Sequence, residues 1–103
     1  MIKVSVMYPN STEATFDLSY YRDRHMPMAH ERLGDACKGT AIDIGLGGGA
    51  PGSPAPYIAI GHLYFDSVQA FQEAFGAHAA EITADVPNYT NTEPVFQICE
   101  VVE

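Results

Sequence analysis

The sequence predicts an α+β fold of the ferredoxin-like type, in which a four-stranded antiparallel sheet carries both helices on one face. Two observations lead to this prediction. Segments that alternate between apolar and polar residues and segments with apolar residues at helical spacing follow one another in the order β-α-β-β-α-β. Each helical segment has one apolar stripe, as that packing requires. The 103 residues suffice for a single domain, residues 1–103.

The chain begins with a strand and a helix. Residues 2–8 alternate in polarity and predict a strand, which the turn-forming residues 9–12 end. Asp17 can cap a helix that continues to about Leu33, and Gly34 can end it. The first two elements are therefore the strand and the crossover helix of the fold.

The middle of the chain predicts a strand followed by a long loop. Residues 36–46 predict the second strand, with four side chains on one face: Thr40, Ile42, Ile44 and Leu46. Residues 47–56 are rich in glycine and proline and predict a flexible loop that could form a rim or lid. Residues 45–50 spell G-x-G-x-x-A, but the prolines that follow exclude the helix that a dinucleotide-binding motif needs.

The last third predicts a strand, a helix and a final strand. Residues 57–65 are rich in aromatic and β-branched side chains and predict the third strand. Asp66 or Ser67 can cap the second helix, and Pro87 ends it. Residues 95–102 predict the fourth strand.

The sheet face without helices has too few polar residues to face water. In the third strand one face carries Ile58, Ile60, His62 and Tyr64 and the other carries Tyr57, Ala59, Leu63 and Phe65, so both faces are largely apolar. Sheets with one wet face alternate cleanly. Charged residues form only 17% of the chain, against about 25% in typical domains. We therefore expect a second copy of the chain to cover this face in a homodimer.

The charge balance excludes two classes of partner. Thirteen acidic residues outnumber five Lys and Arg, for a net charge of −8, which disfavours nucleic acids and anionic membranes. No apolar run approaches the length of a membrane span, and the start of the chain lacks the features of a signal peptide. We expect a cytoplasmic protein whose two cysteines, Cys37 and Cys99, are buried thiols.

His25 is the strongest candidate for chemistry. It shares the apolar face of the first helix with Tyr21 and Met28, and Pro27 should kink the helix beside it. A histidine there can act as a general acid or base. It can equally be a core histidine that a backbone carbonyl satisfies.

Three further side chains have a functional and a structural interpretation. His78 lies at the edge of the second helix's stripe, His62 alternates with apolar residues on the third strand, and Tyr89 follows the helix that Pro87 ends. Each can line a pocket or only stabilise the fold. The spacing of the histidines does not enforce a metal site, and no carboxylate is paired with them, so no metal is expected.

The sequence resembles the EthD family. Phe16-Asp17, Tyr20-Tyr21, His25 and Pro27 match the family's F-D-x-x-Y-Y-x-x-x-H-x-P signature. Phe75-Gly76, His78 and residues 85–90 resemble its second-helix and exit region. The resemblance implies a dimeric α+β barrel and a small apolar ligand between helices and sheet.

The resemblance implies small-molecule chemistry of the kind named for ethyl tert-butyl ether degradation. His25 is then the candidate general acid/base of a cofactor-independent oxygenase, isomerase or dehydratase. No cofactor motif is present, so none is expected. The expected ligand-lining residues are Tyr21, Met28, His62, Phe71, Phe75, His78 and Tyr89. The alternative is a non-catalytic accessory protein that binds a hydrophobic metabolite in an oxidative degradation pathway.

Overall fold

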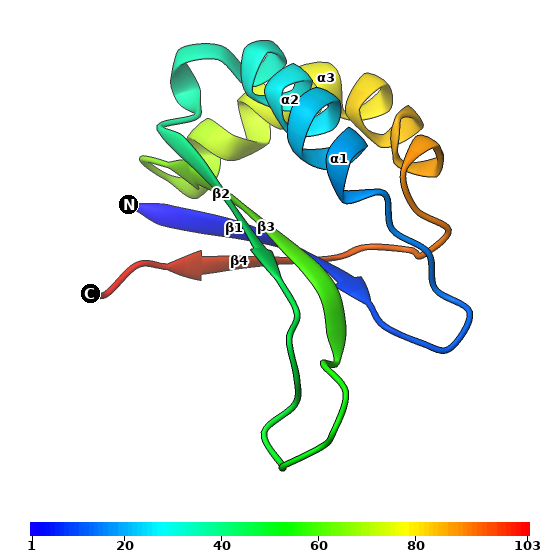
Figure 1. Ribbon diagram of the computed structural model, residues 1–103. Coiled ribbons are helices and arrows are strands. Elements are labelled where there is room, and N and C mark those ends of the chain that lie inside the picture. Colours follow the sequence, from blue (N-terminus) through cyan, green and yellow to red (C-terminus); the bar gives the residue numbers. More distant parts are fainter.

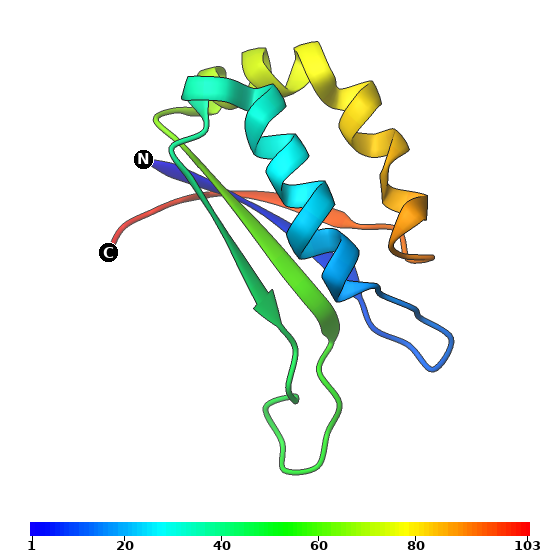
Figure 2. The ribbon, with the colours of Figure 1, turned by 45° about the horizontal axis from the view of Figure 1, so that its top comes forward.

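The computed structural model describes residues 1–103 and has the predicted ferredoxin-like architecture. Four strands, β1 (Ile2–Pro9), β2 (Gly39–Ile44), β3 (Tyr57–Phe65) and β4 (Val95–Glu100), form one antiparallel sheet in the order β2-β3-β1-β4. The helices lie side by side on one face of the sheet (Figures 1 and 2). The prediction of the fold class is confirmed.

The first helix is one continuous rod of three segments: α1 (Leu18–Tyr20), η1 (Tyr21–His25) and α2 (Met26–Leu33). The Asp17 side chain caps its start by accepting a hydrogen bond from the Tyr20 N–H at 3.1 Å. Gly34 ends it with a φ of 65°, a conformation that glycine adopts without strain. Both predicted ends of this helix are confirmed.

The second long helix is α3 (Val68–Ala84), followed by a short 3₁₀ turn, η3 (Val86–Asn88). Of the two predicted caps, Ser67 is the one used, because its hydroxyl accepts a hydrogen bond from the Ala70 N–H at 3.1 Å. Pro87 lies within η3, and the regular helix ends at Ala84, three residues before it.

Three predicted strand boundaries are wrong. The second strand begins only at Gly39, because a 3₁₀ turn, η2 (Gly34–Ala36), follows the first helix. It ends at Ile44, and Leu46 is 99% exposed in the loop that follows. This loop extends away from the helices (Figure 1), so it does not form a rim or lid over the helix side of the sheet. The fourth strand ends at Glu100, before the predicted 102.

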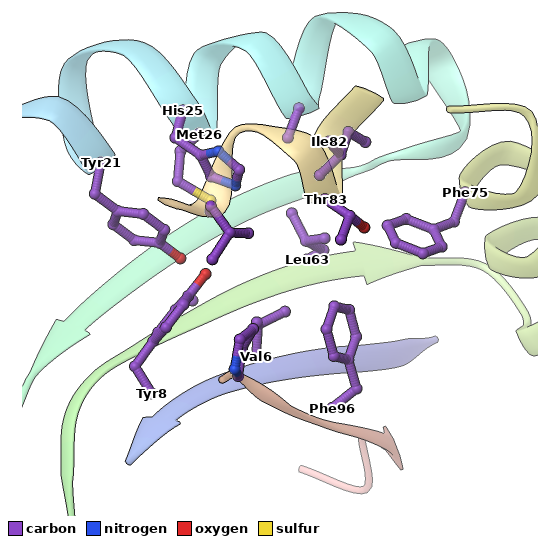
Figure 3. Close-up of a pocket in the computed structure, with 14 residues that line it drawn as sticks. Val6, Tyr8, Tyr21, His25, Met26, Leu63, Phe75, Ile82, Thr83 and Phe96 are labelled. Carbon is purple, nitrogen blue, oxygen red and sulfur yellow. The ribbon is translucent and has the colours of Figure 1, made fainter. Parts of the chain in front are cut away.

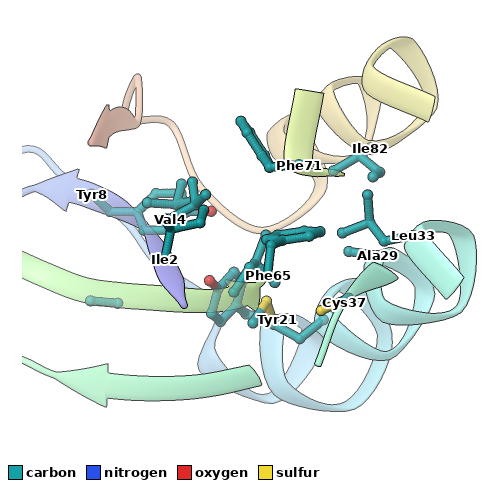
Figure 4. Close-up of a cluster of buried hydrophobic side chains, with 14 of the residues drawn as sticks. Ile2, Val4, Tyr8, Tyr21, Ala29, Leu33, Cys37, Phe65, Phe71 and Ile82 are labelled. Atoms are coloured by element: carbon teal, nitrogen blue, oxygen red, sulfur yellow. The ribbon is translucent and has the colours of Figure 1, made fainter. Parts of the chain in front are cut away.

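The core lies between the sheet and the helices (Figure 4). Strand register places one set of side chains there, with Val4 of β1 opposite Leu63 of β3 and Val6 opposite Gly61. Phe65 is fully buried and packs edge-on against Phe71 of α3, with ring centroids 5.2 Å apart. The helices therefore pack on the face to which the even residues of β1 and the odd residues of β3 point.

The opposite sheet face carries the second set of side chains and has no helix over it. Register places Ile60, His62 and Tyr64 of β3 on it, together with Met7 of β1 and Val95 of β4. Cys37 and Cys99 are both free thiols, and only Cys37 is fully buried. None of the helices is long and apolar enough to span a membrane.

Candidate functional site

A small cavity lies between the sheet and the helices, mostly lined by apolar side chains (Figure 3). Tyr8, Tyr21 and His25 lie at one end, and Phe75 and Phe96 at the other. The cavity volume is about 50 Å³, which is room for a few waters at roughly 10–15 Å³ each. The cavity therefore has a polar end and an apolar end.

The residues at the polar end are placed by an irregular helical turn. Pro27 has no N–H, and its ring would clash with the Asp23 carbonyl in a regular α-helix. The chain avoids this with a π-helical turn, η1, in which the Met26 N–H bonds to the Tyr21 carbonyl five residues back. Both Tyr21 and His25 become buried, with their rings stacked 5.5 Å apart. The predicted distortion at this point is confirmed.

Each ring nitrogen of His25 has a hydrogen-bond partner. Its Nδ1 lies 2.9 Å from Oδ2 of Asp85, the residue at the end of α3. An ionised carboxylate can only accept, so Nδ1 carries the hydrogen and Nε2 has a free lone pair. Nε2 lies 3.3 Å from the Tyr89 hydroxyl, longer than a typical hydrogen bond. Nε2 therefore has a weak partner that a ligand can replace.

Two buried phenols extend this network toward the sheet. The Tyr89 hydroxyl lies 2.7 Å from that of Tyr8, which lines the cavity. Tyr89 is fixed through its backbone, since its carbonyl accepts from the Asp17 N–H at 2.7 Å. The strand β1, the first helix and the segment after α3 therefore meet at this network.

Burial and hydrogen bonding set the charges of these groups. Burial lowers the pKa of His25 below its ordinary value, although the Asp85 carboxylate opposes the shift. Burial alone would raise the pKa of Asp85, but hydrogen bonds from Tyr20, Asn88 and His25 together bring it below its ordinary value. Burial raises the pKa of the Tyr8 and Tyr89 hydroxyls. At neutral pH the site holds a neutral imidazole, a carboxylate and two protonated phenols.

Comparison with known proteins identifies the family. The model of the EthD domain matches residues 9–93. The chain belongs to the EthD family. Its structure is similar to that of an EthD-like protein from Ralstonia eutropha JMP134, with 48% sequence identity and a TM-score of 0.94 over 99% of this chain and 92% of that one.

A second EthD structure supports the fold. It belongs to an ethyl tert-butyl ether (EthD) family protein from Bacillus halodurans C-125, with 15% identity and a TM-score of 0.74 over 99% of each chain. None of the curated proteins matches the chain. The comparisons therefore establish the EthD family and fold, and the chemistry has to be argued from the site.

The structure brings three of the predicted site residues to the cavity wall: Tyr21, His25 and Phe75. Tyr89 lies directly behind the wall, bonded to His25 and Tyr8. Phe71 is a core residue that stacks on Phe75, with ring centroids 5.3 Å apart, and does not line the cavity.

The other three predicted residues lie elsewhere in this EthD domain. Ala29 lies about 40° around the helix from His25 and lines the cavity together with Met26, whereas Met28 lies about 60° to the other side, in the groove between α2 and α3. His62 lies on the open sheet face, where it bonds to Ser5 at 2.9 Å and Asp43 at 2.7 Å. His78 is half-buried on α3 outside the cavity. The histidines do not converge on one point.

Two members of the site escaped the sequence analysis. Asp85 lies 60 positions after its partner His25, so no local spacing connects them. Tyr8 ends an ordinary alternating strand and carries no signal of its own. The one available signal was the match of residues 85–90 to the EthD exit region, which contains Asp85.

Proposed function

We propose that this EthD protein is an enzyme that removes or returns a proton on a small apolar molecule carrying one oxygen. The observation that supports the proposal is the line of hydrogen bonds from Asp85 through His25 to Tyr89 at the wall of an apolar cavity. A buried, neutral histidine held by a carboxylate is a suitable general base near neutral pH. Proton removal beside a carbonyl is a step shared by isomerisation and dehydration.

The cavity supports a consistent pose for such a molecule. Its oxygen lies at the polar end, where the hydroxyls of Tyr8 and Tyr21 can donate to it. The reacting carbon lies beside Nε2 of His25, and its apolar remainder points toward Phe75 and Phe96 (Figure 3). Because the space is small, it suits a compact molecule whose apolar part contacts Phe75 and Phe96.

A second candidate function is binding without conversion. One observation favours it: the side chain of His25 already has hydrogen-bond partners within the protein, as a structural histidine would. Such a protein would hold a hydrophobic metabolite in the same cavity. The two functions differ in whether the base at position 25 accelerates proton exchange.

The test uses butanone, a small ketone, dissolved with the protein in D₂O. We expect the wild type to accelerate deuterium incorporation next to the carbonyl, and His25→Gln to reduce that acceleration by about 10²-fold or more, the usual range for a general base. The control is His30→Gln, which changes an exposed histidine on the same helix. Proton NMR of butanone measures the rates. Equal rates for the two variants would reject the catalytic function, and butanone-induced shifts at cavity residues without exchange would favour binding.

We also propose that two copies assemble through the open sheet faces. The face carries Met7, Ile60 and Val95 without cover from the chain itself. At its border, β4 is an edge strand whose backbone groups are unpaired on one side, and its Val95, on the open face, is 46% exposed. Exposed apolar edges of this kind are sites of association.

Charge on this face should separate the copies. Ile60→Asp places a carboxylate in the middle of the open face, so we expect the mass in sedimentation equilibrium to fall from twice the chain mass to the 11.2 kDa of one chain. Gln72→Asp, on the exposed side of α3, adds the same charge and should leave the mass unchanged. Circular dichroism confirms folding. A wild type that sediments as 11.2 kDa at all concentrations would contradict the proposal.

A further inference from the structure

We propose that His25 exchanges its proton with water through Asp85, on the outer side of the helices, so that the substrate and the proton use separate openings. The inference rests on the proposed role of His25 as a base and adds a route for the proton. It assigns Asp85 as a positioning residue that also carries the proton between the histidine and the solvent.

The two ring nitrogens of His25 point in different directions. His25 lines the cavity, its Nε2 faces Tyr89 directly behind the cavity wall, and its Nδ1 faces Asp85 at the end of α3. The histidine side chain is only 6% exposed, and that of Asp85 is 17% exposed. Asp85 is therefore the first group on the Nδ1 side that meets water.

The water that Asp85 meets lies in a groove between α2 and α3. Its walls are mostly polar and include Tyr20, Arg24, Arg32, Glu81 and Asn88. Met28, which the sequence placed at the ligand, lies in this groove as well. The cavity of Figure 3 lies on the other side of His25 and is mostly apolar. A proton leaves more readily toward the hydrated groove than through the apolar cavity.

Two side chains hold Asp85 in position for this role. The Tyr20 hydroxyl donates to Oδ1 at 2.6 Å, and the Asn88 amide donates to the same oxygen at 2.9 Å. Oδ2 is thereby left for the histidine. Tyr20 belongs to the Tyr20-Tyr21 pair of the EthD signature, so one phenol of the pair serves the groove side and the other serves the cavity.

The proton balance is simple. When Nε2 takes a proton from the substrate, the ring carries two protons and one positive charge. The Nδ1 proton then passes to Oδ2 of Asp85 and from there to a water in the groove, which leaves a neutral ring protonated at Nε2. In the return step Nε2 gives its proton to the product, and a proton from the groove passes through Asp85 to Nδ1, which restores the starting form of the ring. The other titratable or charged groups near the ring are Tyr8, Tyr21 and Tyr89 on the cavity side, and Tyr20 and Arg24 on the groove side.

The experiment uses the free protein, so it does not depend on the natural substrate. Nitrogen-15 NMR of the His25 ring gives its tautomer, and saturation transfer from water gives the exchange rate of the Nδ1 proton. In Asp85→Asn the amide oxygen can still accept the hydrogen bond but cannot take the proton. We expect this exchange to slow by about a hundredfold, the lower end of a general-base effect. The control is Asp23→Asn, which removes an exposed carboxylate of the same helix that pairs with Arg22.

A second variant tests whether the groove is open. Asp85→Ala leaves space for a small carboxylate, and added formate should restore the exchange rate. The proposed route would be overturned if the Nδ1 proton exchanged as fast in Asp85→Asn as in Asp23→Asn. It would also be overturned if formate did not restore the exchange rate in Asp85→Ala.

These measurements are separate from the butanone test. If His25→Gln loses butanone exchange while the Nδ1 proton of Asp85→Asn exchanges at the unchanged rate, only the proton route is rejected. Slowed proton exchange in Asp85→Asn without any butanone turnover rejects only the catalysis.

Discussion

Phe65→Ala should lower the free energy of unfolding by about 3–5 kcal/mol. Phe65 lies on the central strand β3, is fully buried, and packs against Phe71 of α3. Its removal leaves a cavity at the junction between the sheet and α3, where neither element can collapse without disturbing the other. A loss of this size is a large part of the stability of a domain, which is about 5–15 kcal/mol. Urea denaturation followed by circular dichroism measures it.

The matched control for this variant is Phe96→Ala. Phe96 is the same residue on the edge strand β4, where 47% of it is exposed. In the isolated chain its loss should cost less than half as much, because less apolar area leaves contact with the protein. The comparison is made at low protein concentration, where copies separate. Similar losses for the two variants would show that the core is not where the structure places it.

Gly61→Ala should disrupt both the fold and the site. Gly61 lies on β3 directly beneath the first helix, and a Cβ there would overlap the Tyr21 hydroxyl. Tyr21 is 1% exposed and packed among Tyr8, Phe16 and Tyr89, so its ring has no free space to enter. Overpacking of this kind costs about 1–3 kcal/mol. We also expect the Tyr8 and His25 NMR signals to shift, since the displaced phenol contacts both rings.

Gly39→Ala separates the steric effect from the general effect of adding a methyl group to a strand. Gly39 lies on the edge strand β2, and a Cβ there would be 3.9 Å from the Tyr64 ring, an ordinary contact. Alanine also has the better strand propensity. The free energy of unfolding of Gly39→Ala should therefore equal or exceed that of the wild type. If Gly61→Ala were equally well tolerated, the close packing of Tyr21 on β3 would be incorrect.

The fold was predictable from sequence because polarity patterns report which face of each element is buried. The alternation in residues 2–8 and 57–65 follows directly from the two faces of a sheet, one of which the helices cover. Leu46 shows the limit of this reasoning. An apolar residue in phase with a strand was assigned to it, although the backbone had already turned into the loop after Ile44.

The site was only partly predictable, because its contacts join distant parts of the chain. His25 stood out through its own helix and the EthD signature. Asp85 and Tyr8 did not, because their roles arise only where α3 and β1 meet that helix. Met28 was misplaced for a local reason: it was taken to share the inward face with His25, but at i+3 it lies about 60° around the helix, on the side of the groove.

The π-helical turn also matters for how relatives of this protein are aligned. It contains one residue more than the α-helical turn that it replaces, so it behaves as a fixed insertion between Tyr20 and Pro27. In a homologue that lacks this residue the helix can be regular and stay in phase, because the π-helical turn takes up the extra residue within about one turn. A one-residue gap at this point of an alignment therefore marks the loss of the π-helical turn, while the elements on either side keep their places.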